Sequence, residues 1–496
     1  MPNIRIPIVG SYTGRAVGPD VADTKDQRFT NCFPEVVQNP LSGKKSLVLS
    51  KRPGTIASSD VQASATADFG ACVWRSNSDA VSPVVFSYTK SNGTDQMFFT
   101  SAGVQVGADI TGAADCDFLT DTSISGTGNL TACLEDSGTS VKEVWFFPQG
   151  GAWTQITDSD FPSTGICPAH THMDGFMFVM TTNGRIYNSD LNSLSSWTAN
   201  NYLTANSITD GGVGVARYRD HIAAFGDSSV EFFANGGNSV GSPLVRRGTI
   251  NVGAIKTTNG SPILTAGDTV YWVGKMSPSG SGGIYRFNNF QAEKVSNQTI
   301  DKMVDSGQIE YVAGIFGLLG MTHVAFSGNA GLDVVVPCYC IDSGFWWFLD
   351  TAGDIATTAV CGAPVASSSS KSFIASISNA KIYSFDPLLP VWQDNSSAYT
   401  MTAQTEPMDL GTHRRKYWKR LALVYDVQSA ASNVGVSYSD DDYANFSTAR
   451  NIDTNTVQAH LDSLGSSRRR AWKFTHAANT ACRIHAMDID YEVGAH

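Results

Sequence analysis

Short strand-like runs, each ended by turn residues, recur between about residue 62 and residue 388 of this chain. Within a run, apolar and polar residues alternate or β-branched and aromatic residues cluster, and both patterns are typical of β-strands. Helical periodicity is nearly absent, and one short helix is expected at residues 299–307. The sequence therefore predicts an all-β fold. The clearest runs are Ser82–Tyr88, Gln96–Thr100, Glu143–Phe147, Phe176–Thr181, His221–Phe225, Val230–Ala234, Thr269–Gly274, Val334–Cys340, Gly344–Leu349 and Lys381–Phe385.

The spacing of these runs narrows the fold further. They fall into groups of three or four, and successive groups start about 40–50 residues apart, which is the blade spacing of β-propellers. Dividing the region by this spacing gives about seven blades; six or eight stay possible, because no WD or kelch signature marks the repeats. A row of β-sandwiches would not absorb so long a region without a linker. The sequence therefore predicts a β-propeller.

Two changes in composition mark the expected domain boundaries. The chain of 496 residues exceeds the usual size of a single hydrophobic core, so two or more domains are expected. Residues 1–55 are punctuated by prolines, as in Lys51-Arg52-Pro53-Gly54, and are expected to form an N-terminal arm. The segment Asp386–Val391 breaks the strand pattern again, which predicts a propeller at 56–390 and a C-terminal β-sandwich at 391–496. Since a closed propeller brings its first and last blades together, the arm and the sandwich are expected to form one assembly module, separate from the propeller.

The charge of the chain limits the partners that it can hold. Asp and Glu number 45 against 34 Lys and Arg, which gives a formal net charge of −11. Proteins that grip DNA without regard to sequence need clustered Lys and Arg, so this balance argues against a DNA-wrapping function. An acidic wall around a passage through which DNA slides is expected instead, because such a wall repels phosphates near contact.

Metals, cofactors and membrane segments are not expected. The nine cysteines are scattered, odd in number and mostly set in apolar runs, which is typical of reduced core thiols. Cys338 and Cys340 share a strand face, as do His170 and His172, but neither pair has the further ligands that a metal site needs. The first residues lack the apolar block of a signal peptide, and the apolar stretch Tyr311–Met321 is too short to span a bilayer.

Two motifs known from enzymes and propellers lack the context that catalysis needs. Gly237-Asn238-Ser239-Val240-Gly241 matches the nucleophile elbow G-x-S-x-G, but Ser242-Pro243-Leu244-Val245 cannot begin the helix that such a turn requires. The run Ser439–Phe446 resembles an Asp-box turn, with Tyr443 where the turn glycine belongs. An Asp-box stabilises a hairpin without implying catalysis, so the protein is not expected to be an enzyme.

Two basic runs, at residues 414–420 and 468–470, are the dense positive clusters of this acidic chain. Cations on an exposed strand edge can simply prevent pairing with other edges. The alternative is a contact with an acidic protein neighbour, with Trp418 and Trp472 as anchors, because Trp and Arg are enriched at interface hot spots. The residues predicted for this assembly interface are Arg414, Arg415, Lys416, Trp418, Lys419, Arg420, Arg468, Arg469 and Arg470.

The run from Gly211 to Phe233 resembles a known family. It reads GGVGVARYRDHIAAFGDSSVEFF. This follows the pattern G-[IV]-G-x2-[WY]-R-D-x-[IV]-x2-F-G-x-S-[ST]-[IV]-E-[YF]-F of the packaged-DNA stabilisation proteins, the tail hub or nozzle proteins of short-tailed double-stranded DNA bacteriophages. Weaker matches keep the same order along the chain, so the resemblance covers most of it. They are Asn31–Pro34, Leu47–Gly54, Lys294–Asp301 and Tyr417–Arg420.

This resemblance implies a structural, non-enzymatic role in the virion tail. Such proteins form a ring, expected to be a hexamer, that docks under the portal-adaptor ring and extends the DNA channel. The ring retains the packaged genome and lets DNA exit at ejection. The implied partners are further copies of the chain, the portal-adaptor ring, a distal plug or needle, and tail fibre or spike proteins, with double-stranded DNA passing through the lumen. The protein would be made in the host cytoplasm and would need no cofactor.

A glycan-binding or glycan-cleaving propeller of a phage tail is the alternative reading. It would need carboxylates and arginines that converge on the central channel.

Overall fold

The computed structural model describes residues 3–9, 28–38, 45–61, 65–75, 83–124, 128–238, 240–276, 280–328, 335–352, 357–364, 370–376, 380–386 and 390–494. Nearly all regular structure in these ranges is β-strand, so the all-β prediction is confirmed. The helix found in them, α1 (Gln298–Asp305), lies where the sequence predicts one. It begins where the side chain of Asn297 accepts a hydrogen bond from the N–H of Ile300.

Most strands belong to antiparallel sets whose members follow one another in the chain, because short turns join neighbouring strands. The first two sets are β6 (Thr66–Val73), β7 (Val84–Thr89), β8 (Asp95–Thr100), β9 (Ile110–Thr111), and β10 (Ala113–Asp121), β11 (Leu130–Asp136), β12 (Lys142–Phe147), β13 (Thr154–Gln155). The next two are β14 (Thr171–Met173), β15 (Phe176–Met180), β16 (Arg185–Ser189), β17 (Trp197–Thr204), and β18 (Gly212–Tyr218), β19 (His221–Gly226), β20 (Val230–Asn235), β21 (Leu244–Ile250).

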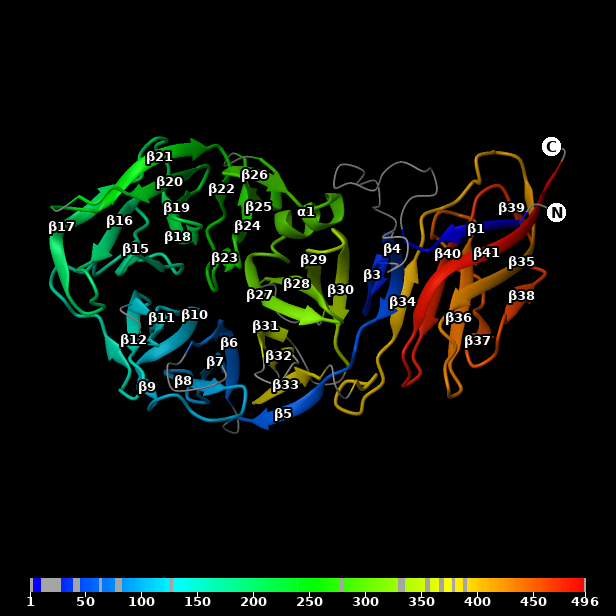
Figure 1. Ribbon diagram of the computed structural model, residues 1–496, viewed down its shortest axis with the longest axis horizontal. Helices are drawn as coiled ribbons and strands as arrows, with labels where there is room; N and C mark the ends of the chain where they lie inside the picture. Colours follow the sequence, from blue (N-terminus) through cyan, green and yellow to red (C-terminus); the bar gives the residue numbers. More distant parts are fainter. Residues whose placement is uncertain are drawn as a thin grey trace.

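The remaining sets of this kind continue in the same order. They are β22 (Gly253–Ala254), β23 (Ile263–Ala266), β24 (Thr269–Lys275), β25 (Gly282–Asn288), β26 (Gln291–Lys294); then β27 (Tyr311–Leu318), β28 (Met321–Ser327), β29 (Val335–Cys340), β30 (Trp346–Asp350); and β31 (Thr357–Pro364), β32 (Ser370–Ser376), β33 (Lys381–Phe385). Figure 1 shows these sets arranged around a common centre, with β6, β10, β18, β23, β27 and β31 innermost in their sets. This is the arrangement of a β-propeller.

Apolar side chains fill the space between neighbouring sets. Phe225 of β19 packs against Trp272 and Phe287 of the next set, with ring centroids 5.4 and 5.7 Å apart. Phe232 lies in the same cluster, whereas Phe233 belongs to the cluster on the other side of its sheet. None of the three phenylalanines is more than 3% exposed. This confirms the strand assignment that the sequence predicts for this run.

Side chains and a loop close the centre of the ring. The N–H of Gly260, in the loop between β22 and β23, donates to Oδ1 of Asp117 on β10 at 2.7 Å. Gly260 has a φ of +71°, and the ring of Tyr311 lies directly over it, where a Cβ would approach the ring to 2.9 Å. The ring of Phe69, on β6, meets Tyr311 edge to face at 5.0 Å. Groups from several sets thus meet near the axis.

A strand from an early part of the chain completes the last set. β5 (Ile56–Asp60) pairs antiparallel with β33, and Asp60 lies opposite Lys381. In Figure 1 this strand, in blue, borders the yellow strands β31–β33. Early and late parts of the chain therefore share one sheet, which closes the ring.

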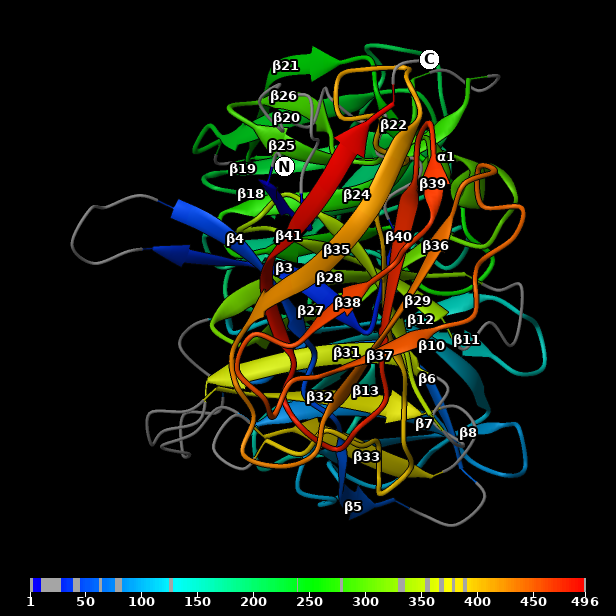
Figure 2. The same ribbon diagram turned by 90° about the vertical axis from the view of Figure 1, so that its right-hand side faces the viewer.

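A second unit stands beside the ring, and Figure 2 views it from its outer side. One of its sheets has the order β3 (Cys32–Gln38), β4 (Lys45–Lys51), β41 (Arg483–Val493), β35 (Lys416–Tyr425), β38 (His460–Asp462), with β1 (Asn3–Pro7) also on β41 and β39 (Ser466–Ser467) also on β35. The facing strands have the order β37 (Arg450–Asp453), β36 (Asn433–Ser439), β40 (Ala471–His476), β34 (Met401–Gln404), β2 (Arg28–Thr30). Trp418 of β35 packs edge to face on Trp472 of β40, at 5.9 Å, in the core between them.

Main-chain hydrogen bonds run without interruption from the second unit into the ring. β2 pairs antiparallel with β34 and also lies parallel beside β30, where Thr30 is opposite Phe348. The N–H of Asn31 adds a hydrogen bond to the carbonyl oxygen of Phe348 at 2.8 Å. Because β27 also pairs in parallel with β31, the sets β27–β30 and β31–β33 belong to this one sheet of 13 strands, which crosses the expected boundary between the assembly module and the propeller.

Candidate functional site

Four of the nine predicted interface residues, Lys416, Trp418, Lys419 and Arg420, lie on β35, which has an inner and an outer side. Lys416 and Trp418 point inward and are at most 1% exposed, whereas Lys419 is exposed, because successive side chains of a strand point to opposite faces. Arg415, which directly precedes the strand, is also exposed. A bulge between Trp418 and Arg420 then changes which positions face inward. Only part of the basic run can therefore meet a partner.

Lys416 is a buried cation that holds two separate chain segments together. Its Nζ donates to the carbonyl oxygens of Thr412 at 2.5 Å, Arg414 at 3.0 Å and Arg468 at 2.5 Å. Burial lowers the pKa of Lys416. Because all three N–H groups of the ammonium are used by main-chain carbonyls, Lys416 fixes the position of the two basic runs relative to each other.

Arg470 is likewise an internal residue. It is 1% exposed, and its guanidinium makes two hydrogen bonds to Asp440, at 2.7 and 2.8 Å, and one to the carbonyl oxygen of Leu464 at 2.6 Å. The guanidinium also lies 3.6 Å from the ring centre of Tyr438. The interface predicted from sequence is corrected here: Lys416, Trp418, Arg470 and the proposed anchor Trp472 are buried within the unit and support its surface from inside.

Two of the remaining six cations are neutralised within the chain: Arg469 forms an ion pair with Asp442, and Lys419 pairs with Glu492 at 3.2 Å. Arg420 is hydrogen-bonded to His460 at 2.9 Å. The others are exposed arginines for which the described part of the chain offers no ion pair or side-chain hydrogen bond. These are Arg414, Arg415 and Arg468, which we call the arginine tip.

The acidic run that neutralises Arg469 and Arg470 has the geometry of an Asp-box turn. Asp441 accepts hydrogen bonds from the side-chain amide of Asn445 at 2.8 Å, from the N–H of Asn445 at 3.0 Å and from the Ser439 hydroxyl at 2.8 Å. These bonds lower the pKa of Asp441 to about 2. Tyr443 has a φ of +69°, which is the conformation that the glycine of this motif supplies. The turn is a structural element, as expected.

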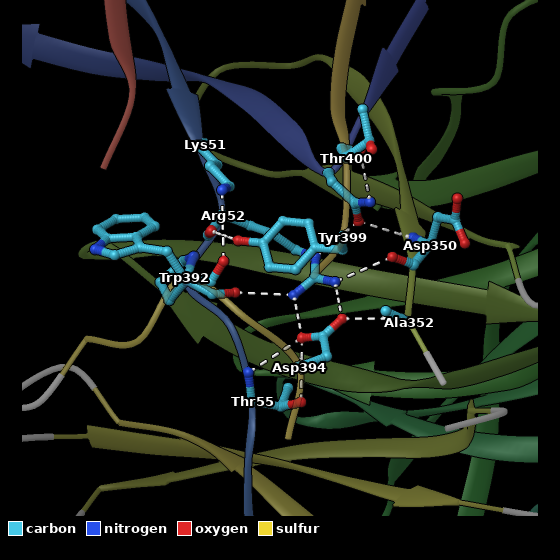
Figure 3. Close-up of polar contacts among 11 residues, drawn as sticks. Lys51, Arg52, Thr55, Asp350, Ala352, Trp392, Asp394, Tyr399 and Thr400 are labelled. Carbon is cyan, nitrogen blue, oxygen red and sulfur yellow. Dashed lines mark hydrogen bonds and ion pairs between the residues drawn. The ribbon is translucent and has the colours of Figure 1, made fainter. Parts of the chain in front are cut away.

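A second polar site, which sequence reasoning did not find, joins the ring to the second unit (Figure 3). Arg52 and Asp394 form an ion pair in which both side chains have 0% exposure. The guanidinium makes two hydrogen bonds to the carboxylate, at 2.9 and 2.5 Å. Its other donors reach Oδ1 of Asn31 at 2.7 Å and the carbonyl oxygen of Asp350, at the end of β30, at 3.0 Å. Arg52 thus binds three segments that are distant in sequence.

Asp394 is satisfied from the side of the ring as well. Its oxygens accept hydrogen bonds from the N–H of Thr55, at 3.1 Å, and from the N–H of Ala352, at 3.0 Å. Thr55 directly precedes the closing strand β5, and Ala352 follows β30. The carboxylate therefore fixes the point at which the chain passes from the second unit into the ring.

Aromatic and cationic neighbours complete this junction. The ring of Tyr399 lies 3.9 Å from the guanidinium carbon of Arg52, and its hydroxyl donates to the carbonyl oxygen of Arg52. Lys51 donates to the carbonyl oxygens of Ala478, at 2.8 Å, and Trp392, at 3.4 Å. Burial lowers the pKa of Lys51 to about 8. The junction is a packed structural contact in which every polar group named here has a partner.

The other residues singled out in the sequence have ordinary surroundings. His170 is buried and hydrogen-bonded to the Thr131 hydroxyl at 2.8 Å, and burial lowers the pKa of His170 and of His172 to about 4 each. Ser239 lies outside the described residues. Across the described ranges, no group of three or more His, Cys, Asp or Glu residues is placed to hold a metal ion. In those same ranges, no helix has the length and apolar character needed to cross a membrane.

These features define a class: an all-β propeller joined to a second unit by a continuous sheet and a buried ion pair, with structural roles for the two sites. The sequence pattern of the phage stabilisation family, described as "Bacteriophage P22 Gp10, beta-propeller", matches residues 42–315, which is more than half of the chain. The chain belongs to this family, as the run from Gly211 to Phe233 predicts. It is therefore a structural, virion-associated protein of a bacteriophage.

Comparison with solved structures finds other proteins of low sequence identity. The computationally designed protein Ika8 covers 70% of this chain and is itself covered to 96%, with 10% identity and a TM-score of 0.36. Sqt1 of Saccharomyces cerevisiae covers 68% of the chain and is covered to 99%, with 8% identity and a TM-score of 0.43. No curated protein matches the sequence.

Proposed function

We propose that this chain is the tail hub, or nozzle, subunit of a short-tailed phage. In this role, copies of the chain form a hexameric ring under the portal-adaptor ring, extend the DNA channel, retain the packaged genome and let DNA leave at ejection. Membership of the P22 Gp10 family, over residues 42–315, is the observation that carries the proposal. A distal plug or needle and tail fibres or spikes are the further partners of this ring.

The two units of the subunit have different functions in this proposal. The seven strand sets from β6 to β33, with β5 in the last set, serve as seven blades of a propeller at 56–390. The arm at 1–55 and a β-sandwich at 391–496 form the assembly module. The pairing of β1 and β4 with β41, and of β2 with β34, supports this grouping.

The junction at Arg52 and the continuous sheet are suited to a subunit that must withstand mechanical load between its assembly module and its propeller. A load on the assembly module is shared among main-chain hydrogen bonds of the sheet and a buried ion pair, so it is not concentrated on a flexible linker. The net charge of −11 supports an acidic wall along the lumen, which repels the phosphates of passing DNA.

Negative-stain microscopy of the purified protein tests the central claim. A ring is expected for the wild type, because a channel needs closed symmetry. Replacing Arg414, Arg415 and Arg420 with Glu should weaken ring formation or docking onto portal-bearing heads, with an unchanged β-sheet circular dichroism spectrum. A wild-type protein that is a monomer or trimer would refute the hub function. A charge-reversed variant that docks like wild type would show that the basic runs are not part of the interface.

A further inference from the structure

The arginine tip brings together two basic runs that lie far apart in sequence. Arg414 stands just before β35, and Arg468 stands just before β40. The carbonyl oxygens of both residues accept hydrogen bonds from the single ammonium of Lys416, at 3.0 and 2.5 Å. The backbones of Arg414 and Arg468 therefore lie close together, and Arg415 directly follows Arg414.

Charge accumulates at this point without compensation by the chain itself. The neighbouring cations Arg469, Arg470 and Lys419 each have a carboxylate partner, whereas the arginines of the tip have none in the described ranges. Lys416 adds a buried positive charge that is hydrogen-bonded only to carbonyl oxygens. The negative charge of Asp409 opposes the lowering of the Lys416 pKa, and Oδ2 of Asp409 also lies 4.0 Å from Nδ1 of His413. An exposed positive site of this kind is complementary to an acidic surface on a partner.

The observations favour a protein carboxylate over a nucleic-acid phosphate. The tip holds three arginines, and a lasting grip on DNA takes many more phosphate contacts than so small a site can make. Tyr417, on β35, is 47% exposed and lies two residues after Arg415, which offers an aromatic surface close to the guanidinium groups. Aromatic and arginine side chains together are typical of protein interfaces.

We propose that Arg414, Arg415 and Arg468 form one binding site for a carboxylate-rich segment of a protein partner. The guanidinium groups bind Asp or Glu side chains through paired N–H donors, a geometry that lysine cannot reproduce. Lys416 is a positioning residue that holds the site together from below. This inference deepens the proposed hub function, because it names the chemistry of the neighbour that docks on the assembly module.

Fluorescence anisotropy with a fluorescein-labelled octaglutamate peptide tests the site directly. Replacing Arg414, Arg415 and Arg468 together with Gln should raise the Kd of the peptide by about tenfold or more, and replacing them with Lys should recover only part of the affinity. The matched control replaces Arg75, Arg185 and Arg247 with Gln, because these are also exposed arginines and the net charge changes equally. The control variant should bind the peptide within about twofold of wild type.

Two results would overturn the inference. One is a wild-type protein that does not bind octaglutamate, or whose affinity is the same in the Gln variant. The other is tight binding of a short DNA duplex. If the duplex binds the wild type as tightly as the peptide does, and the Gln variant loses both affinities equally, phosphate is the ligand. Formation of the hexameric ring is measured separately, by negative-stain microscopy. A protein that forms no hexameric ring but binds octaglutamate through the arginine tip would refute the proposed hub function and support the carboxylate-binding site.

Discussion

Nη2 of Arg52 and Oδ2 of Asp394 are 2.5 Å apart, and neither side chain is reached by solvent. A buried ion pair is worth little relative to a well-packed apolar pair, but removal of one partner leaves an uncompensated charge in a medium of low dielectric constant. Replacing Arg52 alone should therefore lower the free energy of unfolding more than replacing both residues with apolar ones.

Arg52→Met should lower the free energy of unfolding by about 3–5 kcal/mol, because Asp394 then stays buried without its cation. The double variant Arg52→Met with Asp394→Leu should recover part of this loss. Recovery is incomplete because the N–H groups of Thr55 and Ala352 lose their acceptor. Urea unfolding of both variants at neutral pH measures the difference; a double variant less stable than Arg52→Met would contradict the role of unpaired charge.

Acidification should destabilise the protein through its buried histidines. Burial lowers the pKa of His170 to about 4, so between pH 6.5 and 4 the unfolded chain binds a proton there that the folded protein does not. Stability linked to His170 is thus present above pH 6.5 and falls as the pH decreases through this window, by about 2 kcal/mol at pH 5.

His170→Gln isolates this effect from other titrating groups, including buried carboxyls such as Asp117, whose pKa is raised by burial and which act in the opposite direction. The variant should lose less stability than wild type between pH 7 and pH 5 in urea unfolding. An identical loss in both proteins would show that His170 does not titrate as the structure implies.

Phe225→Ala should cost about 3–5 kcal/mol of stability, because the ring is fully buried against Trp272 and Phe287 and its removal leaves a cavity. Val104, which is 62% exposed, offers a control. Val104→Ala should leave the melting temperature nearly unchanged. A Phe225→Ala protein that melts like wild type would mean that the strand is placed wrongly.

Gly260→Ala should destabilise the centre of the ring by about 2 kcal/mol or more, since the new Cβ meets the ring of Tyr311 in addition to the cost of a positive φ. Gly93→Ala is the matched control, because Gly93 has the same φ of +71° but open space around the added atom. The excess loss in Gly260→Ala over Gly93→Ala, measured by thermal unfolding, reports the closed centre. Equal losses would mean that no packing is disturbed there.

Strand periodicity and local motifs could be read from the sequence because they depend on near neighbours. Alternation around Phe225 and Phe232 predicts strands whose side chains are buried, and both are buried in the structure. The helix at α1 follows from a short periodic segment, expected at residues 299–307 and found at Gln298–Asp305. The Asp-box geometry at Ser439 and Asp441 follows from residue spacing alone.

The candidate interface was harder to predict, because charge in a sequence does not tell which side of a strand it occupies. A bulge between Trp418 and Arg420 changes the alternation within the basic run itself. Lys416 is buried because three carbonyl oxygens meet it, and these come from segments that no local pattern joins. Arg52 and Asp394 are separated by 342 positions, so their pairing is a property of the fold.

The closing strand has a consequence for synthesis. β5 leaves the ribosome long before β33, its partner, so the ring stays open until nearly the whole propeller has been translated. In the interval, β5 remains an unpaired strand that other chains can join. Closure by so distant a contact is slow, because much of the chain must be ordered before the contact forms. Yield in the infected cell should therefore be limited by how well nascent chains are kept apart while their blades accumulate.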